Sequence, residues 1–471
     1  MANYIEAAVS SIAGAVLGIM ATAHLARALQ VGVFGQFSLV RTISEYMLLA
    51  STLGVTVVGA RAVATAPHSR NRIVLRVVMV RAAIALTCSA GALIYSVVRP
   101  SPAGWSLVLL AGAVALSALN LDWVFSASEN TRFPSIVRVA SRAFYAALVF
   151  MLVRGPGDLF AASMALGAEM ILVSLVVFGA IGMNVTRASV REAISGIRPM
   201  LKLSFEVGTG QIARQLKTNI DLLMLGVLAT TAAVGYYAAA YRLVMFVNML
   251  AGSFATVLMP RLARVHSVDR DAALKSTVFG LRMSVVLAAG VAAVGVPTGS
   301  AALVGLFGSQ YRPASGVMTI LMIAASFLFV SMTLGNIALA IGRQRDFTTA
   351  TIAAALLNIA LNLVAIPRWG IEGAAAVTLV TEVFLAAWLG WVLRHDGVVA
   401  TLRSGWVARV FLTTVASTGL AVLLRDRGVH WAAVLLASGG AFAMIALALR
   451  VVDVVAVRRE LTQGRGHEML L

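Results

Sequence analysis

Long apolar runs recur along the whole chain and alternate with short polar stretches. Most of them are close to the roughly 20 residues that an α-helix needs to cross about 30 Å of hydrocarbon. They predict about fourteen transmembrane helices, at residues 7–29, 36–58, 76–98, 104–126, 134–153, 158–183, 200–227, 232–259, 275–297, 314–341, 347–366, 371–394, 404–424 and 430–452. The longest gap is about seventeen residues, which is too short for a soluble domain between two helices.

The composition agrees with a chain that lies almost entirely in a membrane. Hydrophobic residues make up 60% of the sequence and charged residues 12%, and the mean hydropathy is +0.93. A soluble globular chain carries about 25% charged residues. The predicted fold class is therefore an all-α membrane protein. No basic residue precedes the first run at Ala7, so we expect a retained helix there and not a cleaved signal.

The basic residues predict the orientation of the chain. The formal net charge is +18, but the arginines are dispersed among the apolar runs, which argues against nucleic acid as a partner. Connections after even-numbered helices are richer in arginine than those after odd-numbered helices. The basic connections contain Arg61, Arg70, Arg72, Arg187, Arg191, Arg198, Arg261, Arg264, Arg270, Arg343, Arg345, Arg403, Arg458, Arg459 and Arg465. By the positive-inside rule we expect a multi-pass protein of the cytoplasmic (inner) membrane with both termini in the cytoplasm.

A weak internal repeat of about 200 residues runs through the chain. Gly35-Gln36-Phe37-Ser38 followed by Arg41 matches Gly235-Tyr236-Tyr237-Ala238 followed by Arg242, and residues 57–61 and 80–81 match 257–261 and 281–282. Six helices separate the copies, which predicts two six-helix lobes in the same orientation, a parallel repeat. The expected organisation is an N-lobe at 1–198 (helices 1–6), a C-lobe at 199–398 (helices 7–12), helices 13 and 14 at 399–452, and a cytoplasmic tail at 453–471.

Ionisable residues inside a span are costly and therefore indicate function. The helix at 200–227 has the largest set, at spacings of about 4, 4, 3 and 4 residues, which confines it to about 80° of arc along about 22 Å. The ionisable members are Glu206, Arg214, Lys217 and Asp221, and Gly210 lies on the same stripe. The pattern predicts a polar stripe through the membrane. The alternative is a stripe paired within itself, with Lys217 and Asp221 one turn apart, that only joins the lobes.

Further arginines lie in other predicted helices. Arg41 and Glu45 form an i, i+4 pair, whereas Arg27, Arg138 and Arg142 have no acid one turn away on their own helix. If these side chains face inward, they create a cationic lumen whose guanidinium groups fit phosphate oxygens. The alternative is that they extend to the membrane interface.

Two other polar sets have simpler interpretations. Asn358 and Asn362 are expected to hydrogen-bond between helices. Tyr236, Tyr237 and Tyr241 fit an aromatic belt at the membrane interface better than a platform for a sugar.

Enzyme chemistry finds no support in the sequence. No glycine precedes any lysine, which excludes a Walker A loop, and the six histidines lack the spacing of metal ligands. No nucleophile and base stand out as a pair. We therefore expect neither catalytic residues nor a metal or other cofactor.

Several segments resemble polysaccharide flippases of the Wzx type, which act in O-antigen and exopolysaccharide biosynthesis. They belong to the exporter superfamily that also contains MATE drug antiporters and the lipid II flippase. The matching segments are N-I-D-L-L-M-L-G, V-G-Y-Y-A-A-A-Y-R-L and M-P-R-L within 212–262, Ala26-Arg27-Ala28-Leu29 with Gly35-Gln36-Phe37-Ser38, Leu121-Asp122-Trp123-Val124-Phe125 with Glu129, and the stretches 306–315 and 358–376. The chain departs from relatives at Ser126-Ala127, where they often have Gln-Gly, in the region of the cytoplasmic gate.

The resemblance implies two MATE-like six-helix lobes that work by alternating access, coupled to an ion gradient. It also implies a central cationic cavity for an undecaprenyl-diphosphate-linked oligosaccharide, which would be the partner together with membrane lipids and polysaccharide polymerase machinery. The residues expected to bind the substrate are Arg27, Arg41, Arg142, Arg214 and Lys217. Those expected to couple the ion are Asp221, Glu206 and Glu45. Arg27 and Asp221 match motif positions of the family; Arg142, Arg214 and Lys217 are assigned by helix geometry alone.

Three other functions compete with this one. A lipid II flippase would share the fold and a basic cavity. A MATE-type drug or cation antiporter would share the fold, but organic cations call for an acidic, aromatic cavity. A scaffold without transport activity has no need of charges deep inside a span.

Overall fold

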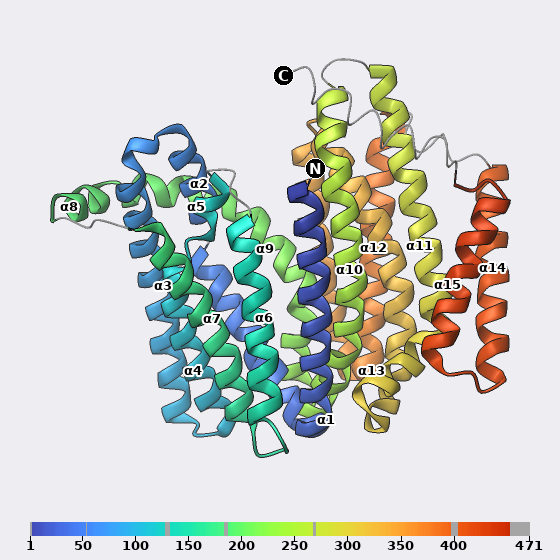
Figure 1. Cartoon of the computed structure of the whole chain (residues 1–471), viewed down its shortest axis with the longest axis horizontal. Coiled ribbons are helices and arrows are strands. Elements are labelled where there is room, and N and C mark those ends of the chain that lie inside the picture. The colour runs from blue at the N-terminus through green and yellow to red at the C-terminus, as the bar shows by residue number, and fades with distance from the viewer. Residues whose placement is uncertain are drawn as a thin grey trace. The chain divides into compact units, whose positions relative to one another are not determined.

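The computed structural model describes residues 2–52, 54–127, 132–182, 187–266, 270–396 and 404–452, so the predicted tail at 453–471 lies outside it. Within these ranges every regular element is a helix (Figure 1). The elements are α1 (Ala2–Thr52), α2 (Val55–Thr65), η1 (Pro67–Ser69), α3 (Arg70–Val98), α4 (Pro102–Leu116), η2 (Ser117–Leu119), α5 (Asp122–Ala127), α6 (Arg132–Leu152), α7 (Leu159–Ile181), α8 (Arg187–Ser195), α9 (Ile197–Leu228), α10 (Thr231–His266), α11 (Arg270–Phe307), η3 (Ser309–Ala314), α12 (Ser315–Ala340), α13 (Gln344–Val392), η4 (Leu393–Asp396), α14 (Ser404–Asp426) and α15 (Trp431–Ala448).

The prediction of an all-helical membrane protein with about fourteen helices is confirmed. The run α13 contains two of the predicted helices, separated by a backbone break at Gly370 (φ 55°, ψ −132°), and α1 contains the first predicted helix and most of the second, separated by a break at Gln30 (φ 62°, ψ 171°). The second predicted helix, 36–58, is itself divided, because α1 ends at Thr52 and α2 begins at Val55 after Gly54 (φ 77°). Ten runs among the described residues are long and apolar enough to span a membrane, and the two broken runs are among them. The two remaining predicted helices correspond to α9 and α10. Within α9, the described segment Asn219–Leu228 is apolar but shorter than a membrane span.

The end of the ninth helix was predicted wrongly. The prediction ended the ninth helix at Pro297, but α11 continues through this proline to Phe307. Proline removes one backbone donor and usually ends a helix. Helices in membranes tolerate it because neighbouring groups and local adjustments satisfy the freed carbonyl.

The chain divides into two compact units. The first comprises Met1–Ala239 with Asn362–Ile371, and the second comprises Ala240–Leu361 with Glu372–Leu471. In the first unit α3, α4, α6 and α7 run side by side (Figure 1), and a buried core of Val74, Val77, Leu121 and Val177 lies among α3, α5 and α7. The predicted lobe boundaries stay a prediction.

The fourth predicted helix, 104–126, is interrupted. It comprises α4, η2 and α5, and the chain is extended at Asn120 (ψ 109°) between η2 and α5. Arg81 of α3, which is 3% exposed, donates from Nη1 to the Asn120 carbonyl at 2.7 Å and from Nη2 to the Ser117 carbonyl at 2.8 Å. Such a break leaves carbonyl groups without helical partners, and burying them unpaired would be costly. Arg81 therefore stabilises the break.

A short helix, α8, was not predicted between the sixth and seventh spans. It lies across the end of α3 (Figure 1). Arg72 Nη1 forms an ion pair with Glu192 Oε2 at 2.7 Å, and Arg76 donates to the carbonyls of Ala193 at 3.0 Å and Glu192 at 3.1 Å. Arg76 thus supplies donors to the last carbonyls of α8 and holds the connection to α9 against α3.

Two glycines at matching positions of the internal repeat lie in a reciprocal contact. A Cβ on Gly35 would meet the Thr231 carbonyl oxygen and, at 2.8 Å, the Gly235 nitrogen. A Cβ on Gly235 would meet the carbonyl oxygen of Val31 and, at 3.0 Å, its carbonyl carbon. Each glycine therefore lets its own backbone approach that of the other repeat copy.

We expect Gly35→Ala and Gly235→Ala to destabilise the protein by about 1–3 kcal/mol each, the usual cost of overpacking. The atoms in the way are backbone atoms, which cannot rotate aside. Thermal unfolding in detergent measures the effect. Gly91→Ala is the matched control, because its Cβ would meet nothing within 4 Å and alanine favours a helix. Equal melting temperatures for Gly35→Ala and Gly91→Ala would contradict the expectation.

In the second unit, α14 and α15 pack on α11. Thr418 of α14 donates to the Ala293 carbonyl at 3.3 Å, and a Cβ on Gly290 would lie 3.2 Å from the Phe442 ring. Farther along α13, the buried carboxylate of Glu382 accepts a hydrogen bond from the Ser331 hydroxyl of α12 at 2.7 Å. Polar pairs of this kind join helices where lipid offers no hydrogen-bond partner.

Candidate functional site

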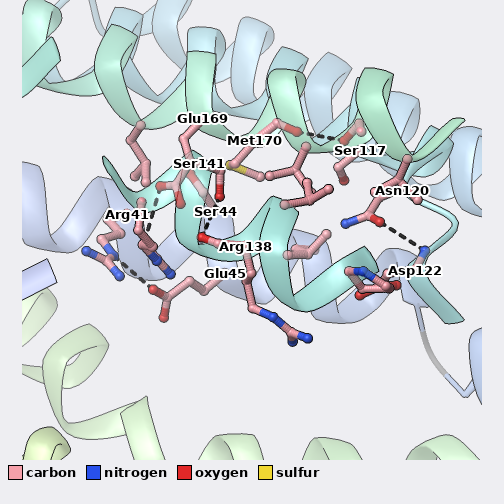
Figure 2. A pocket seen from close by; sticks show the side chains of 18 of the residues that line it. Arg41, Ser44, Glu45, Ser117, Asn120, Asp122, Arg138, Ser141, Glu169 and Met170 are labelled. Atoms are coloured by element: carbon pink, nitrogen blue, oxygen red, sulfur yellow. Dashed lines mark hydrogen bonds and ion pairs between the residues drawn. The ribbon is translucent and has the colours of Figure 1, made fainter. Parts of the chain in front are cut away.

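The first unit contains a cavity of about 370 Å³ among α1, α3, η2, α5, α6 and α7 (Figure 2). Four arginines and three carboxylates line it, together with apolar and hydroxyl side chains. The charged residues are Arg41, Glu45, Arg81, Asp122, Arg138, Arg142 and Glu169. At full ionisation the lining carries a net positive charge of about one. The sequence analysis assigned Arg41 and Arg142 to substrate binding and Glu45 to ion coupling, and the structure brings these three into one cavity lining.

The predicted pair on the second helix is present. Arg41 Nε donates to Glu45 Oε1 at 3.0 Å, with the side chains 15% and 36% exposed. Asn219 of α9 also donates to Glu45, from Nδ2 to Oε2 at 3.4 Å. One helical turn separates Arg41 and Glu45 on α1, so the helix itself brings the two side chains together.

Arg142 is paired with an acid from a different helix. Arg142 Nη1 of α6 lies 3.2 Å from Glu169 Oε2 of α7, and Glu169 also interacts electrostatically with Arg41. The Arg142 side chain is 38% exposed, whereas that of Glu169 is 9% exposed. The arginine therefore reaches the open cavity, and the carboxylate lies behind it.

Arg138 is one helical turn before Arg142 on α6 and has an exposed side chain that extends away from the helices in Figure 2. Among the described residues its guanidinium group makes no ion pair under 4.0 Å. Arg138 is thus the most available cation of the cavity lining. The sequence interpretation left open whether this residue faces a lumen or extends to the interface, and the structure places it in the cavity lining.

Asp221 lies outside that cavity lining, in a buried cluster of the first unit. It is 2% exposed, accepts a hydrogen bond from the Tyr237 hydroxyl of α10 at 2.9 Å and another from Asn362 Nδ2 of α13 at 2.7 Å. The prediction that Asn362 hydrogen-bonds between helices is confirmed; Asn358 likewise donates to Thr381 across the Gly370 break, at 3.5 Å. Tyr237 is fully buried, so the prediction that it belongs to an interface belt is wrong.

The remaining predicted site residues are not brought into this arrangement. Arg27 is exposed, and it does not line the cavity. The side chains of Glu206, Arg214 and Lys217 lie outside the part of the chain that the structure describes. Their roles stay predictions.

Glu169, like Arg81, is a residue of the cavity lining that the sequence analysis missed. It stands alone in an apolar helix, 159–181, and its arginine partner is 27 positions earlier in the chain. A signal was available, because an ionisable residue in the middle of a span is itself an indication of function. The i, i+4 search that found Arg41 and Glu45 could not find a pair that joins two helices.

The arrangement can bind an anion. Guanidinium groups offer planar, two-pronged donors that fit phosphate oxygens, and three of them lie on α1 and α6 along one cavity. Two of these three are held by carboxylates in this state, which keeps their charges compensated inside the membrane.

The chain is similar to proteins of polysaccharide and glycan biosynthesis. The sequence model of the family described as polysaccharide biosynthesis protein matches residues 1–266. The probable low-salt glycan biosynthesis flippase Agl15 of Haloferax volcanii is 25% identical over 228 residues, which cover 47% of this chain and 48% of that protein. The chain thus matches about half the length of this curated relative.

The solved structures show what the fold resembles. Lipid II flippase MurJ in an inward closed conformation matches with a TM-score of 0.76 at 14% identity, over 95% of this chain and 99% of that one. An inward-facing multidrug resistance MATE family transporter of the MOP superfamily matches with a TM-score of 0.66 at 11% identity, over 83% of this chain and 96% of that one. At these identities the likeness is one of fold, that of an all-helical membrane transporter. Because the family model covers more than half of the chain, the chain belongs to the polysaccharide biosynthesis protein family.

Proposed function

We propose that the chain is a flippase that moves an undecaprenyl-diphosphate-linked oligosaccharide from the cytoplasmic to the periplasmic leaflet of the inner membrane. It works by alternating access, coupled to an ion gradient, and performs transport and not catalysis. The observation that carries the proposal is the arginine-lined cavity inside a membrane helix bundle of the polysaccharide biosynthesis family.

The charge of the lipid-linked sugar explains why arginines are needed. A diphosphate carries its negative charge across a region where bare ions cost several kcal/mol or more. Fixed cations reduce this cost. A cavity of about 370 Å³ is near the lower end of ligand pockets, which are roughly 300–1,000 Å³. It has room for a diphosphate and the first sugar, so the polyprenyl chain and the remaining sugars lie outside it.

Other charged residues extend this scheme. Arg27, Arg214 and Lys217 would add cations along the path of the diphosphate, and Asp221 and Glu206 would couple the ion gradient. Arg214→Ala is expected to cripple export at normal membrane abundance. Lysine at this position should rescue only in part, because it keeps the charge and loses the two-pronged fit to phosphate.

The proposal is tested by depleting the protein and identifying the lipid-linked intermediate that accumulates. An undecaprenyl-diphosphate oligosaccharide, retained in the cytoplasmic leaflet and cleared when the gene is restored, is the expected result. Accumulation of lipid II with cell lysis would instead assign the chain to peptidoglycan. Unchanged lipid intermediates together with hypersensitivity to cationic drugs would favour an antiporter. The antiporter function has one observation in its favour, the fold shared with MATE transporters.

Cross-linking of the depleted and restored cells addresses the partners. A flippase that hands its product to polysaccharide polymerase machinery should cross-link to it in the membrane. Lipid substrate and bilayer lipids are the other partners of the proposed activity.

The loop charges predict the topology within the inner membrane. A reporter fused after Arg198 or at the C terminus should be cytoplasmic, whereas one inserted in 298–313 should be periplasmic. The best insertion point in that segment is Gly308, between α11 and η3. Paired alkaline phosphatase and fluorescent protein fusions measure the location. Reversed activity at these three sites would overturn the orientation.

A further inference from the structure

The carboxylate of Glu169 occupies the position at Arg142 that the proposed function gives to a phosphate. Its Oε2 lies 3.2 Å from Arg142 Nη1, a distance at which a phosphate oxygen would also accept a hydrogen bond. As long as the pair persists, the charge of Arg142 is compensated. A diphosphate therefore gains the full attraction of Arg142 only when Glu169 gives up this contact or its charge.

The exposure of the two side chains allows such an exchange. Arg142 is 38% exposed and borders the cavity, so a ligand can reach its guanidinium group from the open side. The Glu169 side chain is 9% exposed and lies behind Arg142 on α7, so a ligand that enters the cavity meets the arginine first. Arg138, one turn away, adds a cation that is already available on the same face of α6.

Glu169 fits the exchange better than the other carboxylate that pairs with an arginine of this cavity. Glu45 is 36% exposed, lies on the same helix as Arg41 and is also contacted by Asn219. Glu169 joins two helices and is the more buried carboxylate, so its charge depends most on Arg142 and Arg41. Loss of this charge would leave Arg142 without its compensating carboxylate, whereas Arg41 would still be paired with Glu45.

The other groups around Glu169 do not replace it. The elements packed against α7 and the cavity contribute Arg41, Glu45, Arg81, Asp122, Arg138 and Arg142, and α6 adds Tyr145; the sequence of α4 has no charged residue. Arg81 is bound to backbone carbonyls. Asp122 is exposed, and it is the third carboxylate of the lining.

We infer that Glu169 is an exchange carboxylate: it competes with the substrate diphosphate for Arg142, and a proton taken up by Glu169 shifts this competition toward the diphosphate. The inference rests on the proposed function. It makes Glu169 a positioning residue that acts through Arg142. Substrate binding and proton binding then reinforce each other at one site, as linkage requires.

The test measures binding of farnesyl diphosphate, a short isoprenyl diphosphate, to the purified full chain in nanodiscs at a series of pH values from about 5 to about 8. Wild-type protein should bind more tightly as the pH falls. Glu169→Gln should bind about tenfold more tightly than wild type at the upper pH, the factor that one charge-assisted contact of about 1.4 kcal/mol supplies. It should also lose the pH response. Because the diphosphate itself titrates, the variants are compared at each pH.

Two further variants sharpen the comparison. Glu192→Gln, on α8 and outside the cavity lining, should behave as wild type. Glu45→Gln should retain the pH response. If Glu45→Gln loses it and Glu169→Gln keeps it, the inference is overturned.

The remaining outcomes separate this inference from the proposed function. Identical affinities and pH profiles for wild type and Glu169→Gln would overturn the exchange role and leave diphosphate transport standing. No binding of farnesyl diphosphate by any form at any pH would overturn both. If Glu169→Gln does not fold, difference infrared spectroscopy on wild-type protein replaces it: binding should produce the band of a protonated carboxyl group, and its absence would reject the exchange.

Discussion

Replacing Arg142 by glutamine is expected to lower export of the lipid-linked oligosaccharide by about ten- to a hundredfold, the effect of losing a hydrogen bond to a charged group worth about 1.5–3 kcal/mol. Glutamine retains length and polarity but cannot offer a two-pronged cation to phosphate. Surface polymer and accumulated lipid-linked intermediate, normalised to membrane abundance, measure the effect. Arg142→Ala should be at least as defective.

Stability must be separated from transport in this experiment. Removing Arg142 leaves the buried Glu169 carboxylate without its nearest cation, and breaking one partner of a buried pair can cost about 3–5 kcal/mol. The double variant Arg142→Gln/Glu169→Gln removes both charges and should restore abundance without restoring export. Wild-type export by Arg142→Gln would mean that Arg142 only joins α6 to α7.

Replacing Asp221 by asparagine is expected to abolish the dependence of transport on the ion gradient while the protein still inserts. Carboxylates inside membranes often relay protons or bind cations, and Asp221 is buried and accepts hydrogen bonds from Tyr237 of α10 and Asn362 of α13. Asparagine keeps the size and removes the charge. Flipping of a fluorescent lipid-linked sugar in vesicles, with and without an imposed proton or sodium gradient, measures the response.

The controls for Asp221 come from the two hydrogen-bond donors that the described residues place at its carboxylate. Tyr237→Phe and Asn362→Ala each remove one hydrogen bond and keep the carboxylate. Each is expected to weaken the gradient response without abolishing it. A normal response in Asp221→Asn would reject the role and turn attention to Glu206, the second candidate on α9.

The apolar pattern predicted the helices well because span length and hydrophobicity are properties of the local sequence. Most predicted spans correspond to one helical segment, and the breaks at Gln30 and Gly370 fall in predicted connections. The interruption at Asn120 was missed because what stabilises it is Arg81, 36–39 positions earlier in the chain. The helix α8 was missed because it is short and polar and is held by contacts to α3.

The side-chain pairs of the site could be predicted only where both residues of a pair lie on one helix. Arg41 and Glu45 follow from i, i+4 spacing. The pair of Arg142 and Glu169 requires the packing of α6 against α7, and the contact of Asn362 with Asp221 joins positions 141 apart. Helix periodicity tells which residues share a face, but it does not tell which faces meet. Tyr237 is an example. From the sequence alone, a tyrosine near the start of a helix is typical of an interface belt, and only the structure shows that its hydroxyl donates to the buried Asp221.

The reciprocal contact of Gly35 and Gly235 has a consequence for the history of the chain. Each repeat copy presents the same glycine to the other copy, and residues 31 and 231 exchange places in the two contacts. This is the isologous relation found in two-fold symmetric homodimers, where residue i meets j and j meets i. An ancestor of half the length would have met its own copy through this surface. Gene duplication and fusion would then have preserved this contact of the dimer inside a single polypeptide.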